Sequence, residues 1–117
     1  MTLKLDLRSH DSRNTPRQTR RRSSDAYLES TVRTLAADLA ARNIRVHALS
    51  AGPVKTRAAS GIERFDELLD RVRERTPANQ LVTVDQIGAV AAFLASEAGA
   101  PLTGSVTFAD RGFHVIA

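Results

Sequence analysis

Helical and strand periods of hydrophobic residues alternate along most of the chain. Apolar residues recur at helical spacing over residues 24–42 and again over residues 63–75, so both ranges are predicted to be amphipathic helices. Between them, residues 44–49 alternate apolar and polar positions and contain β-branched side chains, which favours a strand of a largely buried sheet. The pattern therefore predicts helix, strand and helix in succession.

A third helix is predicted from its capping residues. Thr83 and Gln86 have the spacing of a capping box, in which each side chain bonds the backbone N–H of the other residue. Val82 and Ile87 flank this box at the spacing of a hydrophobic staple, so the helix should begin at Thr83. A turn rich in glycine and proline then leads to a second strand at residues 105–108, which gives an α/β chain of about two strands and three helices.

Residues 1–24 differ in composition from the rest of the chain. They hold seven basic residues against two acidic ones, and their only apolar periodicity is Leu3, Leu5 and Leu7. A segment this polar buries too little surface to offset its ordering entropy, so we expect a disordered basic leader followed by one domain over residues 25–117. The arginine run at residues 17–22 could bind nucleic acid, but no aromatic residue is interleaved with it, and we expect a solvated tail.

The composition excludes several classes of protein. The 117 residues are 42% hydrophobic and 26% charged, which is globular composition, and the absence of cysteine excludes disulfides and thiolate zinc sites. No apolar stretch is long enough to cross a bilayer, so a cytoplasmic protein without a membrane partner is expected. The three histidines are scattered and predict no metal site; His47 alternates with core positions and is expected to be structural.

The first strand ends in a glycine-proline turn at Gly52 and Pro53. Such a break places a loop at the carboxyl edge of a parallel sheet, where ligands bind in open α/β folds. The run VHALSAGPVKTRAASGI, residues 46–62, resembles the cofactor and substrate loop of the NADH-dependent enoyl-acyl-carrier-protein reductases, a divergent branch of the short-chain dehydrogenase/reductase family. The resemblance resumes over residues 82–88, 91–96, 102–106 and 110–113.

The resemblance implies the fold and the site residues. It covers about residues 25–117 and implies the C-terminal part of a Rossmann-like, doubly wound parallel sheet. For NADH it implies Pro53 beneath the nicotinamide ring, the backbone of Val54 on the carboxamide, and the hydroxyl of Thr56 on the carboxamide or pyrophosphate. The residues that it implies for the acyl substrate are small or apolar: Ala58, Ala59, Ile62 and Phe65.

Other positions depart from the family pattern. The catalytic tyrosine and lysine of the family would fall on Gln18 and Asp25, which can neither donate the required proton nor hold the ribose, so no catalytic residue is predicted. No glycine precedes Gly52, so the glycine-rich turn for the pyrophosphate is absent from this sequence. Near the C-terminus, Arg111 stands at a glycine position of the family's DGG ending, where its side chain is expected to obstruct the turn.

Two main hypotheses follow. The first is a fragment of an NADH-dependent enoyl-acyl-carrier-protein reductase of fatty-acid biosynthesis, inactive as this chain alone. The resemblance implies that the parent acts on an acyl-carrier-protein thioester and forms a homotetramer. The alternative is a non-catalytic interaction protein that docks onto full-length reductase subunits through the helix at residues 28–39.

Overall fold

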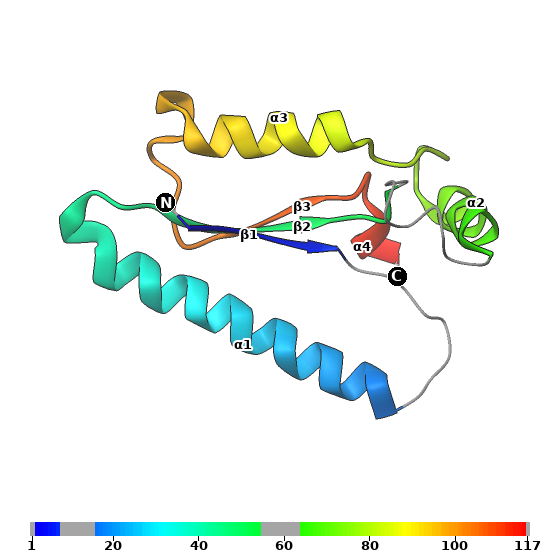
Figure 1. Ribbon diagram of the computed structural model, residues 1–117, viewed down its shortest axis with the longest axis horizontal. Coiled ribbons are helices and arrows are strands. Elements are labelled where there is room, and N and C mark those ends of the chain that lie inside the picture. The colour runs from blue at the N-terminus through cyan, green and yellow to red at the C-terminus, as the bar shows by residue number, and fades with distance from the viewer. Residues whose placement is uncertain (1, 8–15, 55–63, 117) are drawn as a thin grey trace.

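A parallel sheet of three strands lies between helices on both of its faces (Figure 1). The computed structural model describes residues 2–7, 16–54 and 64–116. The strands lie in the order β1, β2, β3, and both pairings are parallel. The elements in chain order are β1 (Thr2–Leu7), α1 (Pro16–Leu39), η1 (Ala40–Arg42), β2 (Val46–Ala51), α2 (Phe65–Arg75), α3 (Val84–Ala95), η2 (Glu97–Gly99), β3 (Val106–Ala109) and α4 (Phe113–Ile116). The predicted α/β architecture with a parallel, doubly covered sheet is confirmed.

β2 is the central strand, and all six of its residues are buried. Its two faces contact different helices. On one face, Val46 and Ala48 form an apolar cluster with Val32 and Ala36 of α1. On the other face, Leu49 and Ala51 pack in a second cluster that includes Val54, Val82 and Ile87. The two clusters bury both faces of β2, as predicted for a strand of a largely buried sheet.

The N-terminal region differs from its prediction. The structure contains a third strand, β1, which pairs with β2 so that Leu3 is opposite His47, and α1 begins at Pro16 rather than at residue 24. The prediction of disorder is therefore wrong for residues 2–7, which form β1, and for residues 16–24, which belong to α1. The alternation of Leu3, Leu5 and Leu7 is the period of a strand, and a neighbouring strand supplies the hydrogen bonds that the segment lacks by itself. The division of the chain into a leader and a domain at residue 24 stays a prediction.

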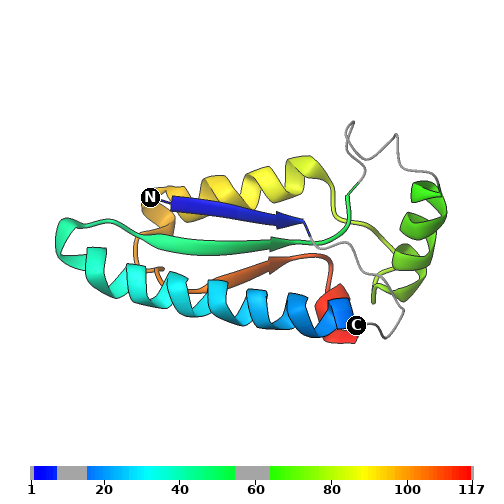
Figure 2. The ribbon, with the colours of Figure 1, turned by 60° about the horizontal axis from the view of Figure 1, so that its bottom comes forward.

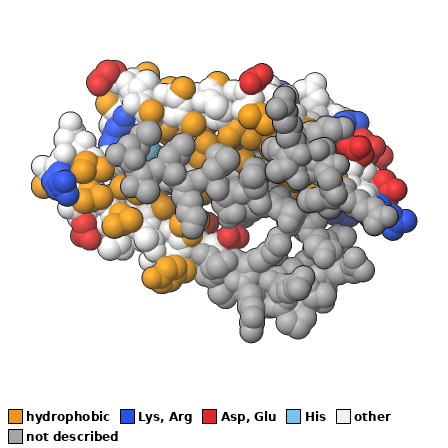
Figure 3. All heavy atoms as spheres, in the orientation of Figure 1, with side chains coloured by type: hydrophobic (Ala, Val, Ile, Leu, Met, Phe, Trp, Pro, Cys, Tyr) orange, Lys and Arg blue, Asp and Glu red, His pale blue; other side chains and the backbone are white. Residues whose placement is uncertain are grey.

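The remaining elements lie within two residues of their predicted positions. The capping box is present: the Thr83 N–H donates to Gln86 Oε1 at 3.2 Å, and the Gln86 N–H donates to Thr83 Oγ1 at 3.2 Å. Val82 and Ile87 belong to one cluster, as the staple predicts. α2 buries Leu69 and Val72 and carries exposed ion pairs on its other face, where Figure 3 shows charged side chains gathered.

Candidate functional site

The loop Gly52–Val54 leaves the carboxyl end of β2 and is fixed to the sheet at both ends. The Gly52 N–H donates to the carbonyl oxygen of Ala109 at 3.1 Å, which continues the pairing of β2 with β3 by one residue. Two residues later, the Val54 side chain is 6% exposed and packs in the cluster below α3. Pro53, between them, is half-buried. The backbone of this loop is therefore held in one place at the edge where α/β folds bind ligands.

Gly52 is in close contact with the end of the neighbouring strand. A Cβ atom at residue 52 would lie 2.8 Å from Asp110 Cβ and 2.9 Å from Asp110 Cα. Real Cβ atoms do not approach other carbons this closely, so only glycine fits without displacing the backbone of Asp110. The glycine of the predicted Gly-Pro turn is thus required by the close approach of two strand ends.

Asp110 is a buried carboxylate that organises the turn after β3. Its side-chain oxygens accept the N–H groups of Gly112 at 3.0 Å and His114 at 2.9 Å, and both oxygens lie 2.9 Å from His114 Nδ1. The His114 ring also stacks on Phe108, with ring centroids 4.1 Å apart. The turn into α4 is therefore built around one carboxylate that is only 7% exposed.

The expected obstruction by Arg111 is wrong. The turn forms with Arg111 at φ 58° and Gly112 at φ 83°, so the arginine adopts the left-handed backbone that glycine takes more easily. Its side chain is exposed and does not enter the turn. Arg111 thus occupies the glycine position of the family at some cost in backbone strain, and the turn after β3 still forms.

The carboxyl end of α2 lies at the same end of the sheet as α4 (Figures 1 and 2). A Cβ atom on Gly112 would lie 3.1 Å from Pro77 Cγ, so the turn after β3 packs directly against the residue that follows Thr76. Thr76 is buried, and its hydroxyl accepts the Gln80 N–H at 3.0 Å, which closes the turn at the end of this helix. Sequence reasoning placed Asp110 and Gly112 in the DGG ending of the family, but it assigned no role to Thr76 or to the contact of Gly112 with Pro77.

The predicted site residues fall into two groups. Pro53 and Val54 are in the loop at the carboxyl edge, and Phe65, half-buried, is the first residue of α2 at that same edge. The other four predicted residues lie outside the described ranges: Thr56, Ala58, Ala59 and Ile62. Their predicted roles therefore stay predictions.

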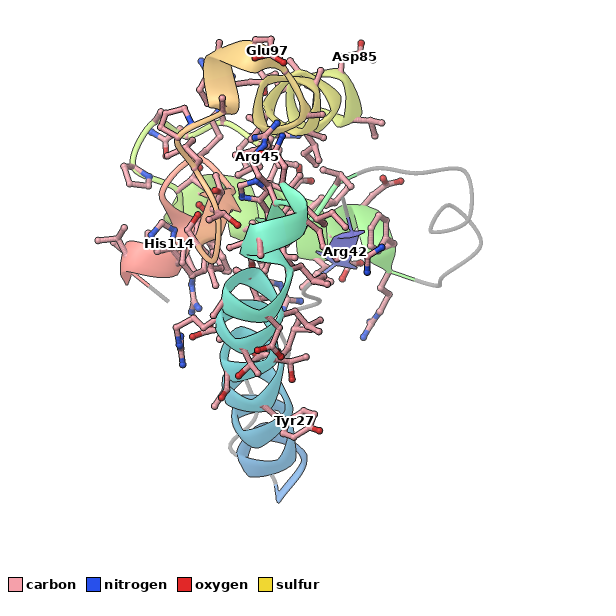
Figure 4. The ribbon with its side chains drawn as sticks, turned by 90° about the vertical axis from the view of Figure 1, so that its left-hand side faces the viewer. Tyr27, Arg42, Arg45, Asp85, Glu97 and His114 are labelled. Atoms are coloured by element: carbon pink, nitrogen blue, oxygen red, sulfur yellow. The ribbon has the colours of Figure 1, made fainter. Side chains whose placement is uncertain are left out.

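At the opposite end of the sheet, Arg45 joins β2 to the end of α3 (Figure 4). Its guanidinium donates to four backbone carbonyl oxygens, those of Leu94, Ala95, Ser96 and Gly99. Carbonyls at a helix C-terminus have no partner within the helix, and a cation there also opposes the negative end of the helix dipole. Arg45 is thus a C-terminal cap for α3, supplied by a residue far away in the sequence.

His47 is buried on the same face of β2, as the sequence predicts. It is 1% exposed, and neither ring nitrogen has a hydrogen-bond partner among the described residues. Burial lowers the pKa of His47 below 6.5, and the positive charge of Arg45 lowers this pKa further. A neutral, inward-facing imidazole beneath α3 is consistent with a structural residue.

The described residues place no tyrosine beside the loop Gly52–Val54. Tyr27 is 77% exposed on α1 and points away from the sheet (Figure 4). Within the described ranges, no group of three or more acidic, histidine or cysteine side chains could hold a metal ion. None of the described helices has the length and apolar character required to cross a membrane.

The parallel sheet, its two helical layers and the braced carboxyl-edge loop define this chain as part of a doubly wound α/β domain. The sequence model of one family, Enoyl-(Acyl carrier protein) reductase, matches residues 8–114. The chain belongs to this family.

Curated relatives carry the same assignment. The chain is 42% identical over 92 residues to the enoyl-[acyl-carrier-protein] reductase [NADH] FabI of Bacillus subtilis, a match that covers 79% of this chain and 36% of that protein. It is also 42% identical over 91 residues to the Staphylococcus aureus FabI, which is named for NADPH; that match covers 78% of this chain and 36% of the relative. The chain thus spans about a third of the length of these relatives.

Solved structures agree with the fold. The enoyl-[acyl-carrier-protein] reductase (NADH) of Aquifex aeolicus has a TM-score of 0.75 and 34% identity, with coverage of 98% of this chain and 45% of that chain. The reductase of Anaplasma phagocytophilum, solved in complex with NAD, has a TM-score of 0.76 and 35% identity, with coverage of 98% and 44%. The match to nearly all of this chain includes the N-terminal region predicted to be a leader.

Proposed function

We propose that this chain is a fragment of an enoyl-acyl-carrier-protein reductase of fatty-acid biosynthesis, and that it supplies the nicotinamide-side loop of the cofactor site. The observation that carries the proposal is the loop Gly52–Val54, which is braced against β3 and anchored by the buried Val54 at the carboxyl edge of the sheet. A backbone held in place by a proline-containing turn can pair with a planar carboxamide at little ordering cost. NADH is the cofactor proposed, because the Bacillus subtilis relative is named for it.

The remainder of the site is assigned by the same proposal. Thr56 binds the carboxamide or pyrophosphate, and α2 forms part of a flap over the acyl chain. The side chains proposed to line that path are Ala58, Ala59, Ile62 and Phe65. The substrate proposed is an acyl-carrier-protein thioester, because the relatives are named enoyl-[acyl-carrier-protein] reductases. The full-length parent is proposed to be a cytoplasmic homotetramer.

The chain alone is proposed to be inactive. NADH, when bound, supplies the hydride that adds to the β-carbon of the enoyl thioester. The thioester oxygen that then gains negative charge must be stabilised and protonated by the protein. Gln18 has no titratable proton and Asp25 has the wrong charge for this task, while Tyr27 lies exposed on α1. The chain therefore provides a binding surface without the acid that completes the reaction.

The experiment that tests this proposal is complementation. The 117-residue chain is mixed, or co-expressed, with the N-terminal two thirds of the Bacillus subtilis relative, and NADH oxidation is followed with a crotonyl thioester. We expect no turnover above the blank for either piece alone and measurable turnover for the pair. Thr56→Ala should reduce turnover of the pair, whereas Asp85→Asn, an exposed change on α3, should leave it unchanged.

Two results would contradict the proposal. Turnover by the chain alone, lost on substitution of Thr56, would show that it is a complete catalyst. A pair of pieces that associates but neither binds NADH nor turns over would show that the loop of this chain does not serve the cofactor site.

A second candidate function is docking onto intact reductase subunits. It is favoured by α1, on which Tyr27 is 77% and Leu35 37% exposed. Tyr27→Asp and Leu35→Glu should abolish co-purification with an intact reductase, and the matched change Asp85→Asn on α3 should not. A monodisperse free monomer that does not co-purify with the reductase would count against this function.

A further inference from the structure

Asp110 lies between two parts of the molecule that the proposed function uses. On one side, its Cα and Cβ atoms are packed directly beneath Gly52, where a Cβ atom would come within 2.9 Å of both. The preceding residue, Ala109, accepts the Gly52 N–H at 3.1 Å. The backbone of the loop after β2 therefore rests on the backbone at residues 109–110, and a shift of one displaces the other.

The position of that backbone depends on the Asp110 carboxylate. Its oxygens accept two main-chain N–H groups, from Gly112 and His114, and contact His114 Nδ1 at 2.9 Å. The main-chain carbonyl of Asp110 accepts the Phe113 N–H at 3.1 Å. Charge-assisted bonds to a carboxylate that is 7% exposed are stronger than ordinary neutral ones, so this single side chain holds the turn into α4 closed.

The closed turn also contacts the end of α2. Gly112, one of the two main-chain donors to Asp110, packs on Pro77, and Phe113 is buried beside it at 8% exposure. Pro77 follows Thr76, whose buried hydroxyl ties the helix end to Gln80. A continuous set of contacts thus leads from Gly52 through Asp110 and Gly112 to the carboxyl end of α2.

We infer that Asp110 is a positioning residue that sets the loop Gly52–Val54 and the carboxyl end of α2 relative to each other. It touches neither cofactor nor substrate; it acts through the turn at residues 110–114. The part of the inference that concerns NADH rests on the proposed function, while the coupling between the loop and α2 is a property of the fold itself. Loss of the carboxylate loosens both the loop and the helix end, because each contacts the turn that Asp110 holds.

The test compares Asp110→Asn and Asp110→Ala with the wild-type chain by hydrogen exchange. Asparagine retains one oxygen that can accept an N–H group, whereas alanine retains none. We expect the amides of Gly52, Val54, Gly112 and His114 and those of Arg73–Thr76 to exchange faster in both variants, by about tenfold or more in the alanine variant. The amides of residues 32–36 in α1, which pack on the other face of β2, serve as the internal reference and should not change, and Asp85→Asn is the matched carboxylate control.

A second measurement connects the turn to the cofactor. In the complemented pair, the Kd for NADH should rise about tenfold in Asp110→Ala and less in Asp110→Asn, which corresponds to the loss of one charge-assisted hydrogen bond. His114→Ala, which removes the ring but leaves the backbone N–H, should give a smaller rise than Asp110→Ala. If the wild-type pair does not bind NADH, the proposed function fails, and the exchange pattern still decides the coupling.

The inference is overturned if Asp110→Ala and Asp110→Asn leave exchange at Gly52 and at the end of α2 equal to that of Asp85→Asn. It is also overturned if only the amides of residues 112 and 114 exchange faster, because the carboxylate would then hold the turn without affecting the loop or α2. Should Asp110→Ala also accelerate exchange at residues 32–36 of α1, that variant is globally unfolded, and Asp110→Asn and His114→Ala decide the question by the same criteria.

Discussion

Nη1 of Arg45 lies 2.7 Å from the carbonyl oxygen of Gly99, and through this contact the residue before β2 holds the end of η2. The same guanidinium also donates to three carbonyl oxygens at the C-terminus of α3. A planar group with five N–H donors in a fixed fork can satisfy several such carbonyls at once, which an ammonium group on a flexible stem does less well. The packing of α3 on the sheet therefore depends on an arginine outside this helix, in the segment that leads into β2.

Replacement of Arg45 should destabilise the chain. Arg45→Met keeps much of the aliphatic stem but leaves the helix-end carbonyls without their donor, and it should lower the free energy of unfolding by about 2 kcal/mol. Arg45→Lys should recover part of this loss, because one ammonium cannot replace the fork. Urea unfolding monitored by circular dichroism gives both values. Equal stability of the methionine variant and wild type would show that water satisfies these carbonyls as well as Arg45 does.

The buried His47 should make the chain sensitive to acid. Its folded-state pKa lies below 6.5, the value expected in the unfolded chain, because burial and the nearby Arg45 disfavour the charged ring. The unfolded state consequently binds more protons as the pH falls through 6.5, so stability decreases from there down to the folded-state pKa and then levels off. Unfolding free energies measured between about pH 5 and pH 8 should show this loss. His47→Met should flatten the curve, and an unchanged slope in that variant would assign the acid sensitivity to other groups.

Features that depend on residues close together in the sequence were predicted correctly. Thr83 and Gln86 are three residues apart, and the helix start that they predict is present with both capping bonds. The role of Arg45 was not recognised, because it bonds carbonyls 49 or more residues away. The contact of Asp110 with Gly52 was also missed, because it joins the ends of two different strands. β1 was missed for the same reason, since a three-leucine alternation becomes a strand only through its parallel partner.

Gly52→Ala and Gly88→Ala should change the stability of the chain in opposite directions, because only the first creates a steric clash. Gly52→Ala places a Cβ atom 2.8 Å from Asp110 Cβ, so it should destabilise the chain by about 1–3 kcal/mol, as overpacking of a closed site does. Gly88→Ala is the matched control: nothing lies within 4 Å of its Cβ position, and alanine in the middle of α3 should stabilise by about 0.5–1 kcal/mol. Thermal unfolding of both variants measures the contrast. If Gly52→Ala is tolerated as well as Gly88→Ala, the two strand ends separate at little cost.

Arg111 offers a substitution that should stabilise the chain. Its φ of 58° lies in the left-handed region, which costs a residue with a side chain about 1–2 kcal/mol, and its exposed guanidinium takes no part in the turn. Arg111→Gly removes this strain but gives the unfolded chain more freedom, so a net gain of about 0.5–1 kcal/mol is expected. Arg111→Ala is the control, since alanine retains the Cβ atom and the strain and should give no gain. Equal unfolding free energies for the glycine and alanine variants would mean that the turn bears no strain at this residue.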